Sequence, residues 1–385
     1  MADRRIYLDH NATSLIRPVA IDAMIHAMSL PGNASSVHTE GRTARAVLEK
    51  AREQVANLVG GRARNVYFTS GGTEANNAAL SPTLRLSSKE HPASCLILGA
   101  TEHPSVLQGH RFAAENVKIL PVDENGIVVK SALSDLLKNI DGRAIVSIHM
   151  ANNETGVIQP VQEIARTVHE HGGILHVDAV QAAGRMLIDL AELEADVLTL
   201  SAHKIGGPKG VGAIVLRSAA TDLGGALIRG GGQERGIRSG TENIAAIAGF
   251  GAAAQEALDT LSDEQTRLLS LRSQLEKGIL ELAPDTVIIG QPVDRLCNTL
   301  SIALPNQRAE TLLIAFDLAG IAVSSGSACS SGKVKRSHVL DAMGMDRSLS
   351  EGAIRVSLGW SSSEEDCISF LQAFEKVLKS LYTGR

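Results

Sequence analysis

Short apolar runs alternate with helical patterns along the first two thirds of the chain. Strand-like runs at 95–100, 144–150 and 197–200 lie between segments whose apolar residues recur every three or four positions, as in 39–59 and 161–171. A period near 3.6 is typical of an amphipathic helix. Alternation of the two patterns predicts an α/β fold with a mostly parallel sheet covered by helices.

The pattern changes after about residue 252. A long amphipathic helix is predicted from there to about residue 279, and strand-like runs follow at 286–289 and 298–304. Further helices are predicted around Leu312 and Phe370. We therefore expect two domains, with their boundary within the long helix.

Polar residues follow successive strand-like runs. His103, Asn153, Asp178 and Lys204 each come at or just after the end of such a run, and ligands of open α/β sheets collect at these ends. Lys204 has small neighbours, so burial there would lower its pKa and make it an amine able to form a Schiff base with a carbonyl cofactor. A solvated loop lysine is the alternative interpretation.

The neighbours of Lys204 favour a pyridine-type cofactor. The Asp178 carboxylate could pair with a ring nitrogen, and Gln181 could donate to a ring oxygen. The His103 imidazole could stack on the ring and move protons near neutral pH. Taken alone, Asp178 could also be a helix N-cap.

A glycine-rich turn at 70–77 predicts a phosphate site. It follows the strand-like run 65–69 and begins a helical pattern, so its backbone N–H groups and the Thr73 hydroxyl could bind an anion. The turn has neither the spacing of an ATP-binding loop nor that of a dinucleotide-binding loop. Many strand-to-helix turns are rich in glycine, so this signal is weak alone.

Cys329 differs in its setting from the other cysteines. It lies among serines and glycines, with basic residues soon after it, which predicts an exposed and mobile loop that favours the thiolate. An incidental loop cysteine is the alternative. The remaining cysteines are predicted to be small buried hydrophobic residues: Cys95, Cys297 and Cys367.

Arg355 lies within the strand-like run 353–358. An arginine there needs a partner, which could be an internal carboxylate. We favour a second role, a bidentate clamp on the carboxylate of an amino acid substrate.

Composition limits the other possibilities. The chain has 385 residues, is 44% hydrophobic, and carries a net charge of −5 from 37 basic and 42 acidic residues. This balance argues against nucleic acid as the main partner. No targeting signal and no membrane-spanning stretch is recognisable, so a cytoplasmic location is expected. The four cysteines show no metal-ligand spacing, so no metal site is expected.

The motifs together resemble those of the group I cysteine desulfurases, in the class V aminotransferase-like superfamily of pyridoxal phosphate (PLP) enzymes. The similarity covers nearly the whole chain and rests on S-G-G-T-E-A-N-N, T-E-H-P-S, N-N-E-T-G, H-V-D-A-V-Q, S-A-H-K, G-G-G-Q-E-R-G-I-R-S-G-T-E-N and S-S-G-S-A-C-S-S-G. Two positions depart from the family pattern, His10 and Ala34, where asparagine and proline are usual. In the family, both positions lie toward the substrate side.

The resemblance implies a PLP transferase of fold type I. Residues 15–255 would form the large PLP-binding domain, and residues 1–14 with 256–385 a smaller domain carrying the cysteine loop and Arg355. The cofactor-binding residues it implies are Gly72, Thr73, His103, Asn153, Asp178, Gln181, Ser201, His203, Lys204 and Thr241. In the family, the equivalent of Thr241 reaches the phosphate of the neighbouring subunit, so a homodimer is expected.

The resemblance also implies the reaction. L-cysteine, anchored by Arg355 and Asn153, would become L-alanine, with Lys204 and His103 as catalytic groups and a persulfide forming on Cys329. The persulfide would pass to a sulfur-acceptor protein, for example in iron–sulfur cluster assembly. The family's housekeeping members have a longer C-terminal tail than this sequence, and that tail helps to dock a scaffold protein. The resemblance therefore leaves three acceptors open: a nitrogenase-type scaffold, a general scaffold and a tRNA thiolation protein.

Three other functions share part of this pattern. A class V aminotransferase would keep the lysine and aspartate but would have no use for Cys329. A selenocysteine lyase could tolerate the loss of that cysteine. A catalytically silent scaffold for sulfur-handling partners would have no reason to keep Lys204, Asp178 and His103 together.

Overall fold

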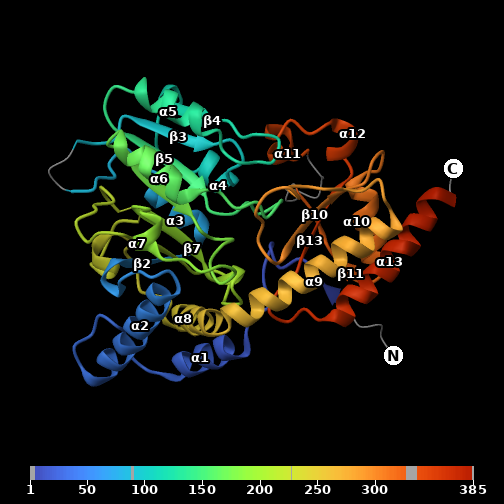
Figure 1. Ribbon diagram of the computed structural model, residues 1–385. Coiled ribbons are helices and arrows are strands. Elements are labelled where there is room, and N and C mark those ends of the chain that lie inside the picture. Colours follow the sequence, from blue (N-terminus) through green and yellow to red (C-terminus); the bar gives the residue numbers. More distant parts are fainter. Residues whose placement is uncertain (1–4, 88–90, 227, 327–335, 384–385) are drawn as a thin grey trace.

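The protein consists of two parts, each built around its own sheet (Figure 1). The structure is a computed structural model that describes residues 5–87, 91–226, 228–326 and 336–383. Helix α9 (Leu261–Leu282) runs from the part with the larger sheet to the part with the smaller one (Figure 1).

The larger part contains a seven-stranded sheet. In spatial order, its strands are β2 (Val66–Thr69), β8 (Gly212–Leu216), β7 (Val197–Ser201), β6 (Ile174–Asp178), β5 (Ala144–His149), β3 (Cys95–Gly99) and β4 (Val117–Leu120). Strand β8 is antiparallel to both of its neighbours, and the other pairs are parallel. The predicted mostly parallel sheet is confirmed.

The central strands are apolar because both faces of the sheet are covered. In β3, Leu96 and Leu98 enter one core, whereas Cys95 and Ile97 enter another on the opposite face. The first core is shared with α3 (Gly72–Ala79). Several helices contribute to the second: α2 (Thr39–Leu58), α5 (Lys130–Lys138), α6 (Val161–Glu170) and α8 (Ile244–Asp259).

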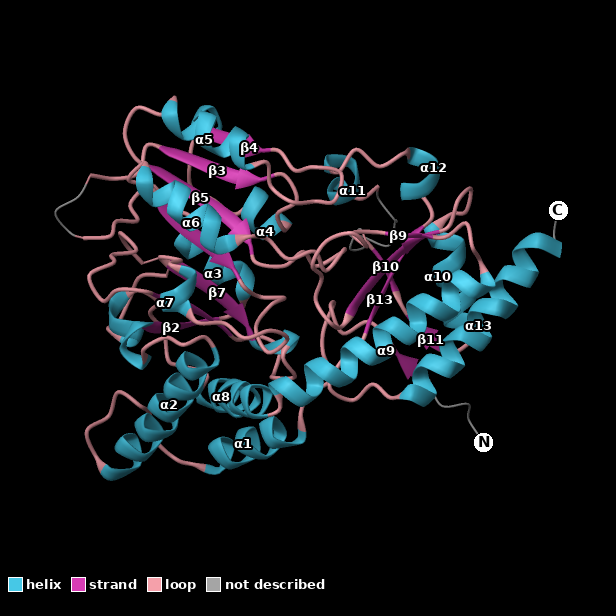
Figure 2. Cartoon of the chain, viewed as in Figure 1, coloured by secondary structure: helices cyan, strands magenta, loops and turns pink. Residues whose placement is uncertain are grey.

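Helix α2 shows how the sequence sets its bounds. The His38 side chain accepts a hydrogen bond from the Gly41 N–H at its start. After its last turn, Gly60 has φ +61°, and a Cβ there would lie 3.0 Å from Asp189 Cα, so glycine suits this turn. The helix predicted over 39–59 is thereby confirmed to within one residue. Helix α1 (Pro18–Ser29) and α2 both lie beside α8 (Figure 2).

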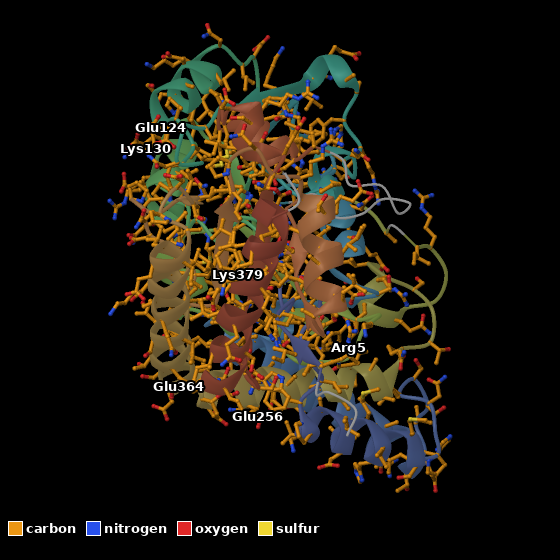
Figure 3. All side chains as sticks on the ribbon, turned by 90° about the vertical axis from the view of Figure 1, so that its right-hand side faces the viewer. Arg5, Glu124, Lys130, Glu256, Glu364 and Lys379 are labelled. Atoms are coloured by element: carbon orange, nitrogen blue, oxygen red, sulfur yellow. The ribbon has the colours of Figure 1, made fainter. Side chains whose placement is uncertain are left out.

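The smaller part is an antiparallel sheet covered by helices. Its strand order is β12 (Ser324–Ser325), β13 (Ala353–Ser357), β10 (Thr299–Ala303) and β9 (Val287–Ile288), and a separate pair joins β1 (Ile6–Tyr7) to β11 (Ile321–Ala322). Its core contains Phe316 on α10 (Ala309–Leu318) and Phe370 on α13 (Glu364–Thr383), stacked 5.1 Å apart. Figure 3 looks onto this part and places Glu364 and Lys379 at two levels along α13.

One predicted element is wrong in detail. The long helix expected from residue 252 onwards is two helices, because α8 ends at Asp259 and α9 begins at Leu261. The Thr260 hydroxyl between them donates to Glu256 O at 2.8 Å, and a hydroxyl that bonds to the preceding turn competes with regular helix propagation. Leu8 packs into the core of the smaller part, but the domain boundary itself stays a prediction.

Among the described residues, no helix has the length and the apolar character needed to cross a membrane.

Candidate active site

A cavity of about 600 Å³ lies where the strand ends of the large sheet face the small sheet. The residues predicted for the site that line it are Gly72, Thr73, His103, Asn153, Asp178, Gln181, Ser201, His203, Lys204 and Arg355. Thr241 is exposed and outside this cavity. Cys329 falls in residues 327–335, outside the described residues.

Lys204 follows β7 in a short 3₁₀ turn, Ala202–Lys204. Its Nζ donates to the backbone carbonyls of Asn11, at 2.5 Å, and Ala12, at 2.9 Å. Burial lowers the pKa of Lys204 to about 7, and the positive charges of Arg355 and Arg185 act in the same direction, against two nearby carboxylates. A lysine amine in this state is a nucleophile and a proton acceptor at neutral pH.

Asp178 ends β6, and its carboxylate is held from two sides. Oδ2 accepts from Asn76 Nδ2 at 2.8 Å, and Oδ1 accepts from the Val180 N–H at 3.0 Å. Asn76 in turn accepts from the Thr199 hydroxyl at 2.6 Å. No helix begins at Asp178, so the helix N-cap alternative is excluded.

The glycine-rich turn places the start of α3 in the cavity. Its N-cap, Gly71, makes no side-chain hydrogen bond, so the first N–H groups of the helix stay available for an anion. A Cβ on Gly72 would lie 3.1 Å from Val180 Cγ2 and 3.3 Å from Ser201 Cβ. Glycine therefore permits this close approach of the helix to the strand ends.

Two of the histidines that line the cavity, His103 and His203, are held in the neutral form. Burial, with the nearby Lys204 and Lys209 charges, lowers the pKa of His203 to about 4. Burial also lowers the pKa of His103. Nδ1 of His103 accepts from the Ser105 N–H at 3.1 Å and caps α4 (Pro104–Leu107), so that nitrogen carries no proton and Nε2 carries it.

Gln181 lies in the turn after β6 and contacts two segments. Its Nε2 donates to Asn11 O at 3.0 Å, and its Oε1 accepts from Arg185 Nη1. The amide is fixed in orientation by these two contacts.

Arg355 lies on β13 and reaches the cavity from the small sheet. Its Nη2 pairs with Asp9 Oδ1 at 2.8 Å, and its Nη1 donates to Asn153 O at 2.8 Å. The internal ion pair considered as the alternative therefore exists. Nε is buried without a partner among the described residues, and the carboxylate clamp stays a prediction.

Gly326 and Ser337 lie close to the two ends of the segment 327–335, and both approach the Glu154 carboxylate. The Ser337 hydroxyl donates to Glu154 Oε2 at 2.5 Å, and a Cβ on Gly326 would lie 2.4 Å from the same oxygen. Glu154 is buried, and its burial raises its pKa. Since Glu154 directly follows Asn153, this anchor lies at the cavity edge.

The remaining cysteines are partly as predicted. Cys95 and Cys367 are buried, and burial raises the pKa of Cys367 to about 12. Cys297 is only half-buried, because it precedes β10 in a turn instead of lying within the strand. Burial still raises the pKa of its thiol, so all three are poor thiolates.

These groups fit PLP. The low-pKa amine of Lys204 suits its aldehyde, the Asp178 carboxylate suits a protonated ring nitrogen, and the uncapped start of α3 suits its phosphate. Among the described residues, no cluster of histidine, cysteine and carboxylate side chains could hold a metal ion.

Sequence reasoning did not single out several polar residues that line the cavity, among them Asn11, Asn76 and His149. Asn76 had a usable signal, since it lies one turn after Thr73 on the same helix face. Asn11 had none, because the N-terminal segment reaches the site only through tertiary packing.

Comparisons with known proteins agree with this chemistry. Residues 6–370 match the family described as aminotransferase class-V. A cysteine desulfurase of Sinorhizobium fredii is 42% identical over 388 residues, covering 99% of this chain and 98% of the relative. A solved NifS-like protein from Rickettsia africae shares 37% identity with a TM-score of 0.88, covering 98% of this chain and all of its own.

A third structure, SspA in complex with cysteine, is 28% identical with a TM-score of 0.76, and the match covers 92% of this chain and 98% of SspA. The agreement in sequence extends over nearly the full length of each chain. The protein therefore belongs to the cysteine desulfurases, which are PLP-dependent enzymes of the class-V aminotransferase family.

Proposed function

We propose that the cavity converts L-cysteine to L-alanine and places the sulfur on Cys329 as a persulfide. The observation that carries this proposal is the Lys204 amine, with its pKa lowered to about 7, in one cavity with Asp178 and Arg355. A proton acceptor, a partner for a ring nitrogen and a partner for a carboxylate are what an amino acid reaction with PLP requires.

PLP, when bound, draws electrons away from Cα of an amino acid. Its phosphate would be held by the start of α3 with Gly72 and Thr73, and by Ser201 and the neutral His203. Asp178 would keep its ring nitrogen protonated, because Asn76 and Val180 already hold the carboxylate in place. Around the rest of the ring, Gln181 and Asn153 would contact its polar edge and His103 would stack on its face.

Lys204 moves the proton in this proposal. Its amine is half neutral near pH 7, so it accepts a proton from Cα of the substrate and can return one to the product. Nε2–H of the neutral His103 provides a hydrogen-bond donor at the cavity.

Arg355 holds the substrate. Its guanidinium already donates to Asp9 and to Asn153 O, and its Nε, which meets no partner in the described part of the chain, leaves capacity for a further acceptor. The substrate carboxylate would share or replace Asp9 as the anionic partner of this fork. Asn153 would bind the same substrate beside Arg355.

Cys329 takes the sulfur. Its thiolate attacks the sulfur of the substrate, an S–S bond forms and the C–S bond breaks. The electron pair of the C–S bond stays with the carbon, which is protonated to give alanine, so no external oxidant is needed. The persulfide then passes to an acceptor, for which we propose a scaffold protein of iron–sulfur cluster assembly or a tRNA thiolation protein.

We further propose a homodimer. Exposed apolar residues gather on α1, where Ile25 is 61% and Met28 is 73% exposed, and such a patch is typical of a protein interface. Thr241, exposed near the start of α8, would reach the phosphate of the neighbouring subunit. Sedimentation of the PLP-bound protein tests this, and an active monomer would contradict it.

The decisive experiment measures both products. Purified protein is incubated with L-cysteine and a reductant, and sulfide and alanine are quantified beside Cys329→Ser and the matched control Cys297→Ser. We expect equal amounts of both products from the wild type and from the control, and neither from Cys329→Ser. An active Cys329→Ser variant would refute the role of Cys329. Pyruvate formation or amino-group transfer without sulfide would favour a lyase or an aminotransferase.

A further inference from the structure

A second buried arginine lies behind the active site and has no role in the mechanism above. Arg185 is only 7% exposed. It follows Gly184, which has φ +69° and whose Cβ would lie 3.0 Å from Ile205 Cγ2. A residue other than glycine would be strained there, so the turn that directs Arg185 inward depends on Gly184.

The positive charge of Arg185 is not cancelled by a carboxylate. In the described part of the chain it forms no ion pair within 4.0 Å, and its donors meet neutral oxygens: Gln181 O at 3.2 Å, His10 O at 3.2 Å, Lys204 O at 3.4 Å and the side-chain oxygen of Gln181. Burial lowers the pKa of Arg185 to about 10, which still leaves the guanidinium charged at neutral pH.

The contacts of Arg185 lead to the Lys204 amine by a closed path. Arg185 holds Oε1 of Gln181, and Nε2 of Gln181 donates to Asn11 O. The same Asn11 carbonyl accepts from Lys204 Nζ, and Arg185 also contacts the Lys204 backbone carbonyl. The Arg185 guanidinium therefore joins three segments of the chain: the N-terminal segment with Asn11, the turn 181–185 and the turn that contains Lys204.

We propose that Arg185 is a positioning residue that places a fixed positive charge behind Lys204 and sets the orientation of the Gln181 amide toward the cofactor ring. The inference rests on the proposed function, because it assigns a purpose to the state of the Lys204 amine. It concerns side chains of this chain alone, and it can be tested without turnover.

Other charges also act on Lys204. Arg355 lies on the opposite wall and also lowers the pKa of the amine, whereas Asp9 and Asp178 raise it. His103 and His203 are held neutral by burial and add little charge. Because Arg355 is paired with Asp9, part of its charge is offset, and Arg185 is the cation near Lys204 that no carboxylate offsets among the described residues.

A purely structural role would give a different result from an electrostatic one. Arg185→Met removes the charge and keeps the length, whereas Arg185→Lys keeps the charge and loses the fork. Arg272→Met is the control, since Arg272 is also buried and also donates to backbone carbonyls, Arg295 O and Leu296 O, but its charge faces Glu276 on its own helix at 3.3 Å. All variants are first checked for folding by circular dichroism.

The measurement is the pH dependence of Lys204 labelling by acetic anhydride in the full-length protein after PLP is removed, read by peptide mass spectrometry. We expect the wild type and Arg272→Met to share a midpoint near pH 7. Arg185→Met should shift it upward by about one pH unit, which lowers labelling at pH 7 about fivefold. Arg185→Lys should keep the midpoint but bind PLP roughly three- to tenfold more weakly, because Gln181 is released.

An unchanged midpoint in Arg185→Met would overturn the proposal. So would a shift of equal size in Arg272→Met. If Arg185→Met does not fold, Arg185→Gln replaces it, and failure of both to fold while Arg185→Lys keeps wild-type PLP affinity would show a structural role only. A shifted midpoint in a protein without desulfurase activity would support this inference and reject the proposed function, so the two can fail separately.

Discussion

The cavity has two walls that are built differently. The cofactor wall, formed by the large sheet, contains Asp178, Lys204 and the start of α3, and hydrogen bonds from neighbouring segments hold its polar groups. The substrate wall, formed by the small part, contains Arg355 with the partly buried Leu313 and Val323. On that wall, one ion pair and one carbonyl hold the charged group.

This difference indicates that the two walls respond differently to change. The Asp178 contacts of the cofactor wall arise within one sheet and the helix beside it, and Lys204 adds two contacts to the N-terminal segment. Arg355 pairs with Asp9 of the N-terminal segment, which lies beside β13, and reaches Asn153 across the boundary between the two sheets. Damage to the small part should therefore affect substrate binding more than cofactor binding.

The largest expected effect is on the cofactor wall. Lys204→Ala removes the proposed proton acceptor, and alanine formation from L-cysteine should fall about a thousandfold or more. Lys118→Ala on the exposed strand β4 serves as the control and should keep its rate. A Lys204→Ala variant within tenfold of the wild type would show that another group moves the proton.

Arg355→Lys tests the substrate wall. The lysine keeps the positive charge but loses the planar fork, so KM for L-cysteine should rise about 10- to 100-fold. PLP affinity, measured by fluorescence titration, should stay within twofold of the wild type. Arg308→Met, an exposed arginine of the same part, should change neither quantity. Loss of PLP binding in Arg355→Lys would mean that the two walls are not independent.

A matched pair of core changes sharpens the comparison. Phe370→Leu in the small part and Phe250→Leu in the large part each replace a fully buried ring and should lower the free energy of unfolding by about 1 to 2 kcal/mol. Only Phe370→Leu should raise KM for L-cysteine, by a few-fold, because its core supports β13. Equal KM values in the two variants would contradict the assignment of substrate binding to the small part.

The smallest effect concerns stability and pH in the protein without PLP. The pKa of Lys204 is about 7 in the folded chain, against an ordinary value of 10.5, so the unfolded chain binds more protons between these values. Lys204 therefore destabilises the fold fully below pH 7, and the penalty is relieved as pH rises toward 10.5. Lys204→Met should raise the free energy of unfolding by about 1 kcal/mol at pH 6 and by less at pH 9.

Urea unfolding at the two pH values measures this difference. Buried neutral histidines such as His176, whose pKa burial lowers to about 4, also make stability fall below about pH 6.5, but their contribution cancels between the two proteins. A gain of the same size at both pH values would show that Lys204→Met acts through packing and not through charge.

Much of the cofactor wall could be predicted from the sequence because parallel strands bring their ends to one edge. Asp178, His103 and Lys204 each follow an apolar run, so their shared position follows from the fold. The alternation of apolar runs and helical patterns likewise predicted the large sheet. The helix break at Thr260 was missed, because apolar periodicity continues through it.

The contacts across the boundary could not be predicted in the same way. Asn11 enters the site from the N-terminal segment, and the partner of Arg355 is Asp9. No pattern in the sequence singles out Arg185. In each case the role depends on which distant segment packs beside the residue, and periodicity within one segment carries no information about that.

Glu154 has a consequence for protein engineering. Its carboxylate accepts from Ser337 and leaves no room for a side chain at Gly326, so described residues close to both ends of the segment 327–335 lie beside one carboxylate. A segment that is to be exchanged needs flanking residues whose positions stay the same. Segments of other composition inserted between Gly326 and Ser337 would test whether this stretch selects the proposed sulfur acceptor, provided that the glycine, the serine and the glutamate are all retained.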